Sequence, residues 1–212
     1  MKRSLLLSAL FACSASLLVS SGCSGLLSSP EYHETSVYDL GFPDVQEKLP
    51  FTLTVRPFSS DSSTRYKMLF RNGEQLTPDE FSRWSRTPSE MLTRYCMIAF
   101  SGSTDRSAPG TSPEREYVLT GTVLVFETDL NDKISRLYVR CSLSDAGNDS
   151  RILWSKTYFI KTPAVLSPDA PGKGAAASMR LAAGTFIRDL SLDLTFFSRS
   201  TAAGETHSRT GK

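Results

Sequence analysis

The feature that most constrains the fold is a run of three segments, 117–127, 134–143 and 152–161, in which apolar and polar residues alternate. A period of two is typical of strands with one buried face. The segments are joined by "TDLND" and "SDAGNDS", turn-prone links whose length favours antiparallel neighbours. The sequence therefore predicts a meander with one face in the core and the other in solvent or under a partner. The middle segment shows both faces: Leu137, Val139, Cys141 and Leu143 against Arg136, Tyr138 and Arg140.

Earlier strands and a final helix complete the pattern. "VYDL", "FTLTVRPF" at 51–58 and "RYKMLFR" at 65–71 favour strands, and Asn72-Gly73 is a strong turn signal. From about Ala175 to Leu194 apolar residues recur every 3.6 positions, which predicts a helix. This order predicts an α+β fold: a single domain with a mainly antiparallel sheet and helices packed on one face.

A doublet between these parts repeats one motif, first as "TPDE" at 77–80 and then as "TPSE" at 87–90. In each copy the threonine can cap a helix, the proline fits the first helical position, and the glutamate can reach back to the cap. We therefore expect a short helix from Thr77 and a longer one from Thr87, with Trp84 near the corner between them. Arg83 and Trp84 are the candidate contact surface for a partner; the alternative is that Trp84 packs into the core.

The N-terminus has the pattern of an export signal. Lys2 and Arg3 precede an uncharged apolar run, which ends at "VSSGC". Small residues before Cys23 resemble a bacterial lipobox, in which the cysteine is acylated and becomes the new N-terminus. Ser20 stands where such signals usually have leucine. Cys13 is the competing lipidation site, and ordinary cleavage to a soluble secreted protein is the other alternative.

This interpretation divides the chain into a lipoprotein signal peptide (1–22), a lipidated tether (23–36), the folded domain (37–196) and a disordered tail (197–212). Ser24 lacks the aspartate of an inner-membrane retention signal, which predicts a lipid-anchored protein of the outer membrane facing the periplasm. Without Lys2 and Arg3 the mature chain has 22 basic and 22 acidic residues. This balance argues against a nucleic-acid partner.

Catalytic and metal-binding patterns are missing from the predicted domain. The two histidines, His33 and His207, fall in the tether and the tail, which removes the usual base of a nucleophilic triad. Cys96 and Cys141 either pair in the periplasm or remain two buried thiols, and they are too few for a zinc site. The paired carboxylates are explained by a helix start (Asp79, Glu80) or by solvation (Glu114, Glu116). We expect no enzyme activity, no cofactor and no metal.

Several segments together resemble one family. "YDLG", "RYKMLFR", "EFSRWSRTPSEML", "YVLTGTVLVFE", "RILWSKTYF" and "AAASMRLAAGTFIRDL" occur in that order between residues 38 and 194. They are similar to the ABC-type transport auxiliary lipoproteins, outer-membrane components of MCE-type lipid transport systems. This chain departs from the family at Met179-Arg180, where Gln or Asn is common.

The resemblance implies a non-enzymatic accessory protein that docks a periplasmic MCE-domain protein, with phospholipid as a further candidate partner. Homo-oligomers are compatible with this role. The alternative is a structural companion lipoprotein that assists the assembly of an outer-membrane protein or secretin. Gene neighbours would separate the two: MCE, permease and ATPase genes favour the first, and a barrel gene favours the second.

Overall fold

The computed structural model describes residues 34–60, 66–103 and 115–209. The chain divides into two units, Met1–Glu34 and Thr35–Lys212. The predicted signal peptide, both candidate lipidation sites (Cys13 and Cys23) and most of the tether lie outside the described residues. The described elements all belong to the second unit.

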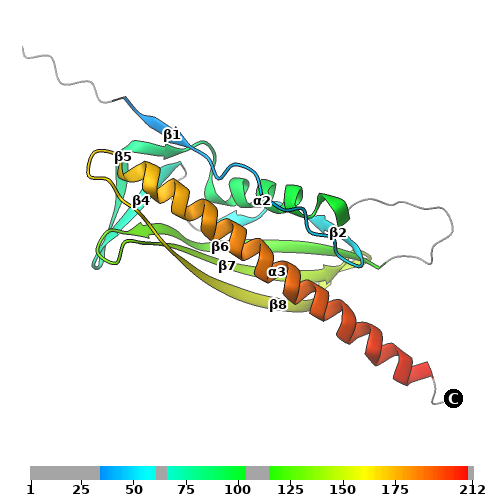
Figure 1. Ribbon diagram of the computed structural model, residues 1–212. Helices are drawn as coiled ribbons and strands as arrows, with labels where there is room; N and C mark the ends of the chain where they lie inside the picture. Colours follow the sequence, from blue (N-terminus) through cyan, green and yellow to red (C-terminus); the bar gives the residue numbers. More distant parts are fainter. Residues whose placement is uncertain (1–33, 61–65, 104–114, 210–212) are drawn as a thin grey trace, which may run out of the picture. The chain divides into compact units, whose positions relative to one another are not determined.

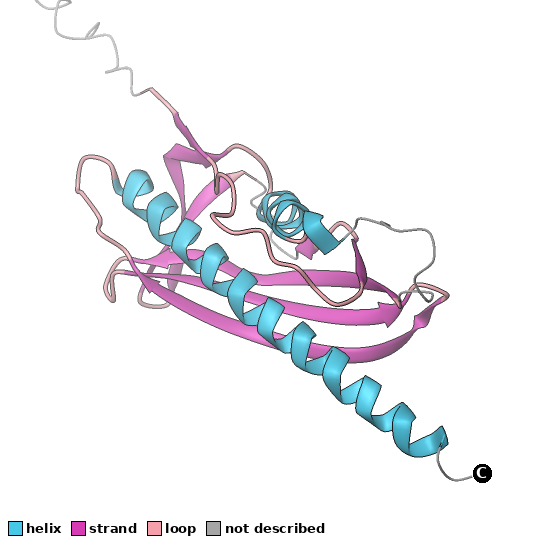
Figure 2. Cartoon of the chain, turned by 45° about the vertical axis from the view of Figure 1, so that its right-hand side comes forward, coloured by secondary structure: helices cyan, strands magenta, loops and turns pink. Residues whose placement is uncertain are grey.

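One sheet and two helices make up the described part of this unit (Figures 1 and 2). Strands β1, β5, β4, β6, β7 and β8 follow one another in the sheet, and β2 and β3 also pair with β6. The long pairings β4–β5, β6–β7 and β7–β8 are antiparallel, whereas β1–β5, β2–β6, β3–β6 and β4–β6 are parallel and shorter. The predicted α+β class and mostly antiparallel sheet are confirmed. The elements are β1 (Ser36–Tyr38), β2 (Thr52–Val55), β3 (Ser59–Ser60), β4 (Lys67–Asn72), β5 (Gln75–Trp84), α2 (Pro88–Ala99), the 3-10 turn η1 (Ser101–Ser103), β6 (Glu116–Asp129), β7 (Ile134–Asp145), β8 (Asn148–Pro163) and α3 (Pro171–Arg209).

The core lies between the sheet and the helices. Helix α3 crosses β7 and β8 on one face, and α2 packs beside it against β2 and β6 (Figure 2). The predicted inward residues of β7 are fully buried, and β8 adds Tyr158 and Ile160 to the same face. The predicted apolar stripe of α3 completes the core: Met179, Ala183, Phe186, Ile187, Leu190 and Leu194.

The first copy of the doublet does not start a helix, so that prediction is wrong. Residues 75–84 form strand β5, and a tight turn at Gly73, with φ of 61°, pairs Asn72 with Gln75. Once the hairpin closes, its pairing outweighs a capping motif worth only about 1 kcal/mol. Pro78 has no N–H to donate to a ladder, and its partner Leu69 lies next to a register shift in β4.

The second copy forms the predicted capping box. Thr87 precedes α2, its Oγ1 accepts a hydrogen bond from the Glu90 N–H at 3.3 Å, and the Thr87 N–H donates to Glu90 Oε2 at 3.0 Å. Pro88 occupies the first helical turn, where its missing N–H costs nothing. These contacts hold the pKa of the Glu90 carboxyl below its usual value, chiefly through the bond from the Thr87 N–H.

Replacing Thr87 by alanine should lower the free energy of unfolding by about 1 kcal/mol, because the Glu90 N–H loses its acceptor. Urea denaturation followed by circular dichroism measures the change. The matched control is Thr54→Ala on an exposed face of β2, which should move stability by less than about 0.5 kcal/mol. Equal effects of the two substitutions would contradict the cap.

Helix α3 is longer at both ends than the sequence predicts. It begins at Pro171 and not near Ala175, so the Pro/Gly-rich "APGKGAA" is mostly the first turn of a helix. It also continues to Arg209, so the prediction of a disordered tail is wrong for residues 197–209. An established helix gains a hydrogen bond with each added residue and needs no apolar stripe to continue, and no proline follows Pro171.

Candidate functional site

The two residues predicted to contact a partner lie together at the end of β5 but face different surroundings. Trp84 is buried, with 4% of its surface exposed, and its ring meets Phe126 edge to face at 5.1 Å. Arg83 is exposed and lies opposite Val37 of β1 and Lys67 of β4. Trp84 therefore packs into the core, which is the alternative given for it above. A partner contact at this point stays a prediction and would be made by Arg83.

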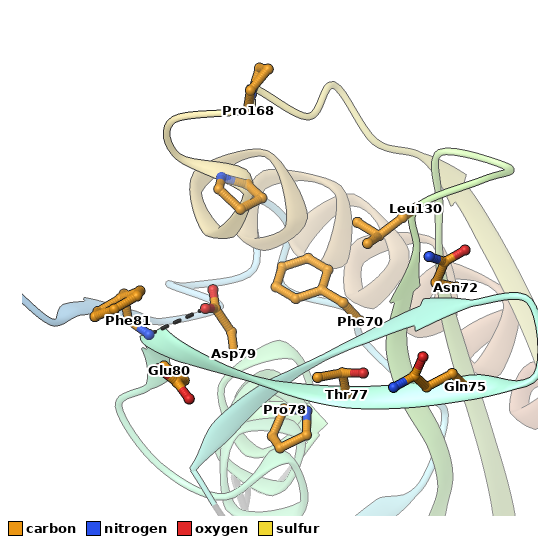
Figure 3. A pocket seen from close by; sticks show the side chains of 11 residues that line it. Phe70, Asn72, Gln75, Thr77, Pro78, Asp79, Glu80, Phe81, Leu130 and Pro168 are labelled. Atoms are coloured by element: carbon orange, nitrogen blue, oxygen red, sulfur yellow. Dashed lines mark hydrogen bonds between the residues drawn. The ribbon is translucent and has the colours of Figure 1, made fainter. Parts of the chain in front are cut away.

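The first copy of the doublet lines a pocket. We call it the hairpin pocket; its volume is about 640 Å³, and it lies between the β4–β5 hairpin, the β6–β7 turn and the loop that leads into α3 (Figure 3). Eleven residues line it: Phe70, Asn72, Gln75, Thr77, Pro78, Asp79, Glu80, Phe81, Leu130, Pro168 and Pro171. The volume is in the range of small-molecule sites, about 300 to 1,000 Å³.

Apolar side chains form most of its wall. Phe70 is buried at the core end of the pocket, while Phe81 and Leu130 keep 45% and 38% of their surfaces exposed. Figure 3 shows Phe70 and Leu130 turned towards the space below the start of α3, with Asp79 on β5 turned the same way. The charged residues that line the pocket are Asp79 and Glu80. The pocket is therefore an apolar recess with an acidic rim.

Two glycines at the start of α3 allow the helix to close one side of the pocket. A Cβ on Gly172 would lie 2.2 Å from Ser82 Oγ, and one on Gly174 would lie 1.9 Å from the Val165 carbonyl oxygen. Side chains at these positions would push the helix away from β5 and from its own loop. The next turn is fixed to β8, because Thr162 Oγ1 donates to the Ser178 carbonyl and Ser178 Oγ donates to that of Thr162, at 2.9 and 3.0 Å.

A network of ion pairs supports the turn that carries Leu130. Glu127 on β6 accepts two hydrogen bonds from the Arg71 guanidinium, at 2.5 and 2.9 Å, and its exposed fraction is 5%. Arg136 on β7 reaches Glu127 at 3.4 Å and Asp129 at 2.7 Å. Because the Leu130 N–H donates to the Arg71 carbonyl at 2.9 Å, the network and the pocket wall share one backbone contact.

Asp129 makes stability depend on pH. Its Oδ1 accepts the N–H groups of Asp132 and Asn131, and these bonds together with Arg136 hold the pKa of Asp129 below its usual value. A lowered pKa contributes stability above the pKa of the unfolded chain, and the contribution is lost as the pH falls through the folded value. Asp129→Asn should therefore destabilise at neutral pH and approach the parent protein near pH 2 in urea titrations. A difference that stays constant between about pH 2 and 6 would contradict this.

Cys96 and Cys141 are free and buried, which resolves the two alternatives for this pair in favour of unpaired thiols. Burial raises the pKa of Cys141 to about 12, and burial together with the nearby Cys141 raises that of Cys96. We expect both thiols to resist iodoacetamide at pH 8 in the native protein and to react fully in urea, because the thiolate is the reactive form. Mass spectrometry would measure the modification; rapid labelling of the native protein would contradict this prediction.

The described part of the chain shows neither a metal site nor a membrane-spanning helix. No group of three or more His, Cys, Asp or Glu side chains in residues 34–60, 66–103 and 115–209 could hold a metal ion. Over the same residues, no helix combines the length and the apolar character needed to cross a bilayer. What the hairpin pocket can do chemically is to bind an apolar group beside two carboxylates.

Sequence reasoning does not reveal this pocket. The pair Asp79 and Glu80 is visible in the sequence, but its charge is equally well explained by the dipole of a helix start. Phe70, Leu130 and Pro171 come from three distant segments, and no local pattern joins them. The available signal is the turn at Asn72-Gly73, which fixes a hairpin and so excludes a helix from Thr77.

Comparison with known proteins shows the fold. No family model matches the chain, and no curated protein matches it. Protein XCC0632 from Xanthomonas campestris, with the family designation DUF330, shares the fold with a TM-score of 0.59 at 19% identity over 79% of this chain and 99% of its own. An uncharacterized protein of known structure gives 0.53 at 13% identity, over 74% and 99%. A candidate lipoprotein from Caulobacter crescentus CB15 reaches 0.34 at 18% identity, over 50% and 79%, too low to support an argument.

Proposed function

We propose that this protein is a lipid-anchored accessory component of an MCE-type intermembrane lipid transport system. It acts from the periplasmic face of the outer membrane, by binding and not by chemistry. Acylation at Cys23 anchors the chain, and the tether connects that anchor to the domain. The domain docks an MCE-domain protein and brings its partner close to the outer membrane.

The supporting observation is that the segments similar to the auxiliary lipoproteins supply the core of the domain. Each contributes a buried aromatic or large apolar residue. These residues come from the segment after β1 and from β4, β5, α2, β6, β8 and α3, and they join one cluster between sheet and helices: Leu40, Met68, Trp84, Leu92, Phe126, Tyr158 and Phe186. The resemblance therefore involves residues that set the domain's architecture, and it is more than a similarity of isolated surface motifs.

Capture from cross-linked cell envelopes tests the proposal. The full chain with a C-terminal affinity tag is expected to retain an MCE-domain protein, identified by mass spectrometry. An abundant outer-membrane lipoprotein with the same tag serves as the control for non-specific capture. Recovery of a barrel or secretin without an MCE protein would support the alternative, an assembly companion, and would overturn the proposed function.

A further inference from the structure

We propose that the hairpin pocket binds one acyl chain of an aminophospholipid drawn from the membrane to which the protein is anchored. This inference deepens the proposed function, and it rests on that function for the membrane anchor alone.

The size and lining of the pocket fit an apolar chain. Phe70, Leu130, Pro168 and Pro171 are among the residues that line a recess of about 640 Å³, and Figure 3 shows Phe70 and Leu130 turned towards the same space. Phe81, which also lines the pocket, keeps 45% of its surface exposed. An acyl chain removes this surface from water, and each buried methylene should tighten binding about fourfold.

The position of the pocket in the fold places it where the tether joins the domain. Strand β1, the first element after the tether, pairs with Ser82–Trp84, and the strand residues just before them, Thr77–Phe81, line the pocket. Figure 1 shows β1, β5 and the start of α3 at the same end of the domain. Twelve residues separate Cys23 from Ser36, and fully extended they span at most about 45 Å. The bilayer that holds the anchor is therefore the nearest source of acyl chains.

The charges at the rim select the headgroup. The charged residues that line the pocket are Asp79 and Glu80, both acidic. Asp79 is held in place by a hydrogen bond that its Oδ1 accepts from the Phe81 N–H at 3.2 Å. In Figure 3 Asp79 is turned towards Phe70, and Glu80 lies on the other side of β5. The Asp79 carboxylate, with the negative charge of Glu80 next to it in the strand, attracts an ammonium group and repels a headgroup with net negative charge. Phosphatidylethanolamine therefore fits better than phosphatidylglycerol.

Photo-crosslinking in vesicles tests the site and the selectivity together. The full acylated chain is reconstituted into vesicles of phosphatidylethanolamine and phosphatidylglycerol, with a diazirine on the acyl chain of one lipid or the other. We expect the ethanolamine probe to label peptides that line the hairpin pocket. It should label them about two- to fivefold more than the glycerol probe, because an exposed charge pair strengthens binding by about that factor.

Three variants give the controls. Thr77→Trp fills the pocket without adding charge and should reduce labelling by both probes at least fivefold. Thr54→Trp places the same side chain on an exposed strand elsewhere and should leave labelling unchanged. Asp79→Asn with Glu80→Gln keeps the acceptor oxygen for the Phe81 N–H and should make the two probes equal. Circular dichroism checks that each variant folds.

The results separate this inference from the proposed function. Label outside the pocket, or full labelling of Thr77→Trp, would overturn the acyl-chain site. Equal labelling by the two lipids in the native protein would overturn headgroup selection. Because the vesicles contain no transport protein, either outcome is independent of whether an MCE partner is captured from envelopes.

Discussion

Replacing Cys23 by serine is expected to release the protein from the membrane and to abolish incorporation of labelled palmitate. The sulfur of Cys23 is the predicted acceptor of diacylglycerol, and serine removes it. Each buried methylene of an acyl chain contributes about 0.8 kcal/mol to membrane binding, so two or three chains make release negligible and their loss decisive. Fractionation of cells that express the full chain, with labelling, measures both effects.

The matched control is Cys13→Ser, which removes the competing candidate site and should leave labelling and membrane attachment intact. If Cys13→Ser lost the labelling and the membrane attachment while Cys23→Ser kept them, the acylated residue would be Cys13, and the mature chain would begin there. Absence of label from the parent protein would support cleavage to a soluble secreted form and would remove the premise of the proposed function.

Replacing Glu127 by alanine is expected to lower the free energy of unfolding by about 3 kcal/mol. Glu127 is buried between two guanidiniums, and its removal leaves Arg71 without its bidentate partner. Breaking a buried pair costs about 3–5 kcal/mol because the remaining charge stays desolvated. The Arg71 side chain is 27% exposed, so water offsets part of this cost and the lower end of the range applies. Urea denaturation measures the difference.

A double substitution distinguishes the ion pair from simple loss of packing. Arg71→Met with Glu127→Leu removes both charges and keeps apolar volume, so it should be less destabilising than Glu127→Ala alone. Glu74→Ala, on the exposed turn of the hairpin, is the control and should change stability by less than about 0.5 kcal/mol. A double variant less stable than Glu127→Ala would contradict the pairing.

The parts of the fold that the sequence predicts correctly are those with a repeated local signal. The alternation in 134–143 gives both faces of β7, and the stripe from Met179 to Leu194 gives the buried face of α3. The cap at Thr87 is also local, because its partners lie within three residues. The periodicity of β7 and α3 extends over enough residues to exclude the competing structure, whereas the capping pattern alone does not, because its first copy lies in a strand.

The parts that could not be predicted depend on contacts between distant segments. "TPDE" and "TPSE" have the same capping pattern, but only the first follows a hairpin turn, and pairing with β4 makes it a strand. Gly172 and Gly174 favour a loop in the sequence, yet they lie in α3. Their role there is close packing, because Ser82 and Val165 approach too closely for a side chain. The hairpin pocket joins both of these regions, so its residues come together only once the chain has folded.

Flotation with purified components tests most directly whether this lipoprotein holds an MCE-domain protein at the outer membrane. The acylated full chain in vesicles is mixed with a purified MCE-domain protein from the same organism and centrifuged through a density gradient. We expect the MCE-domain protein to rise with vesicles that carry the lipoprotein and to stay at the bottom with empty vesicles. An MCE-domain protein that stays at the bottom in both cases would contradict the proposed function.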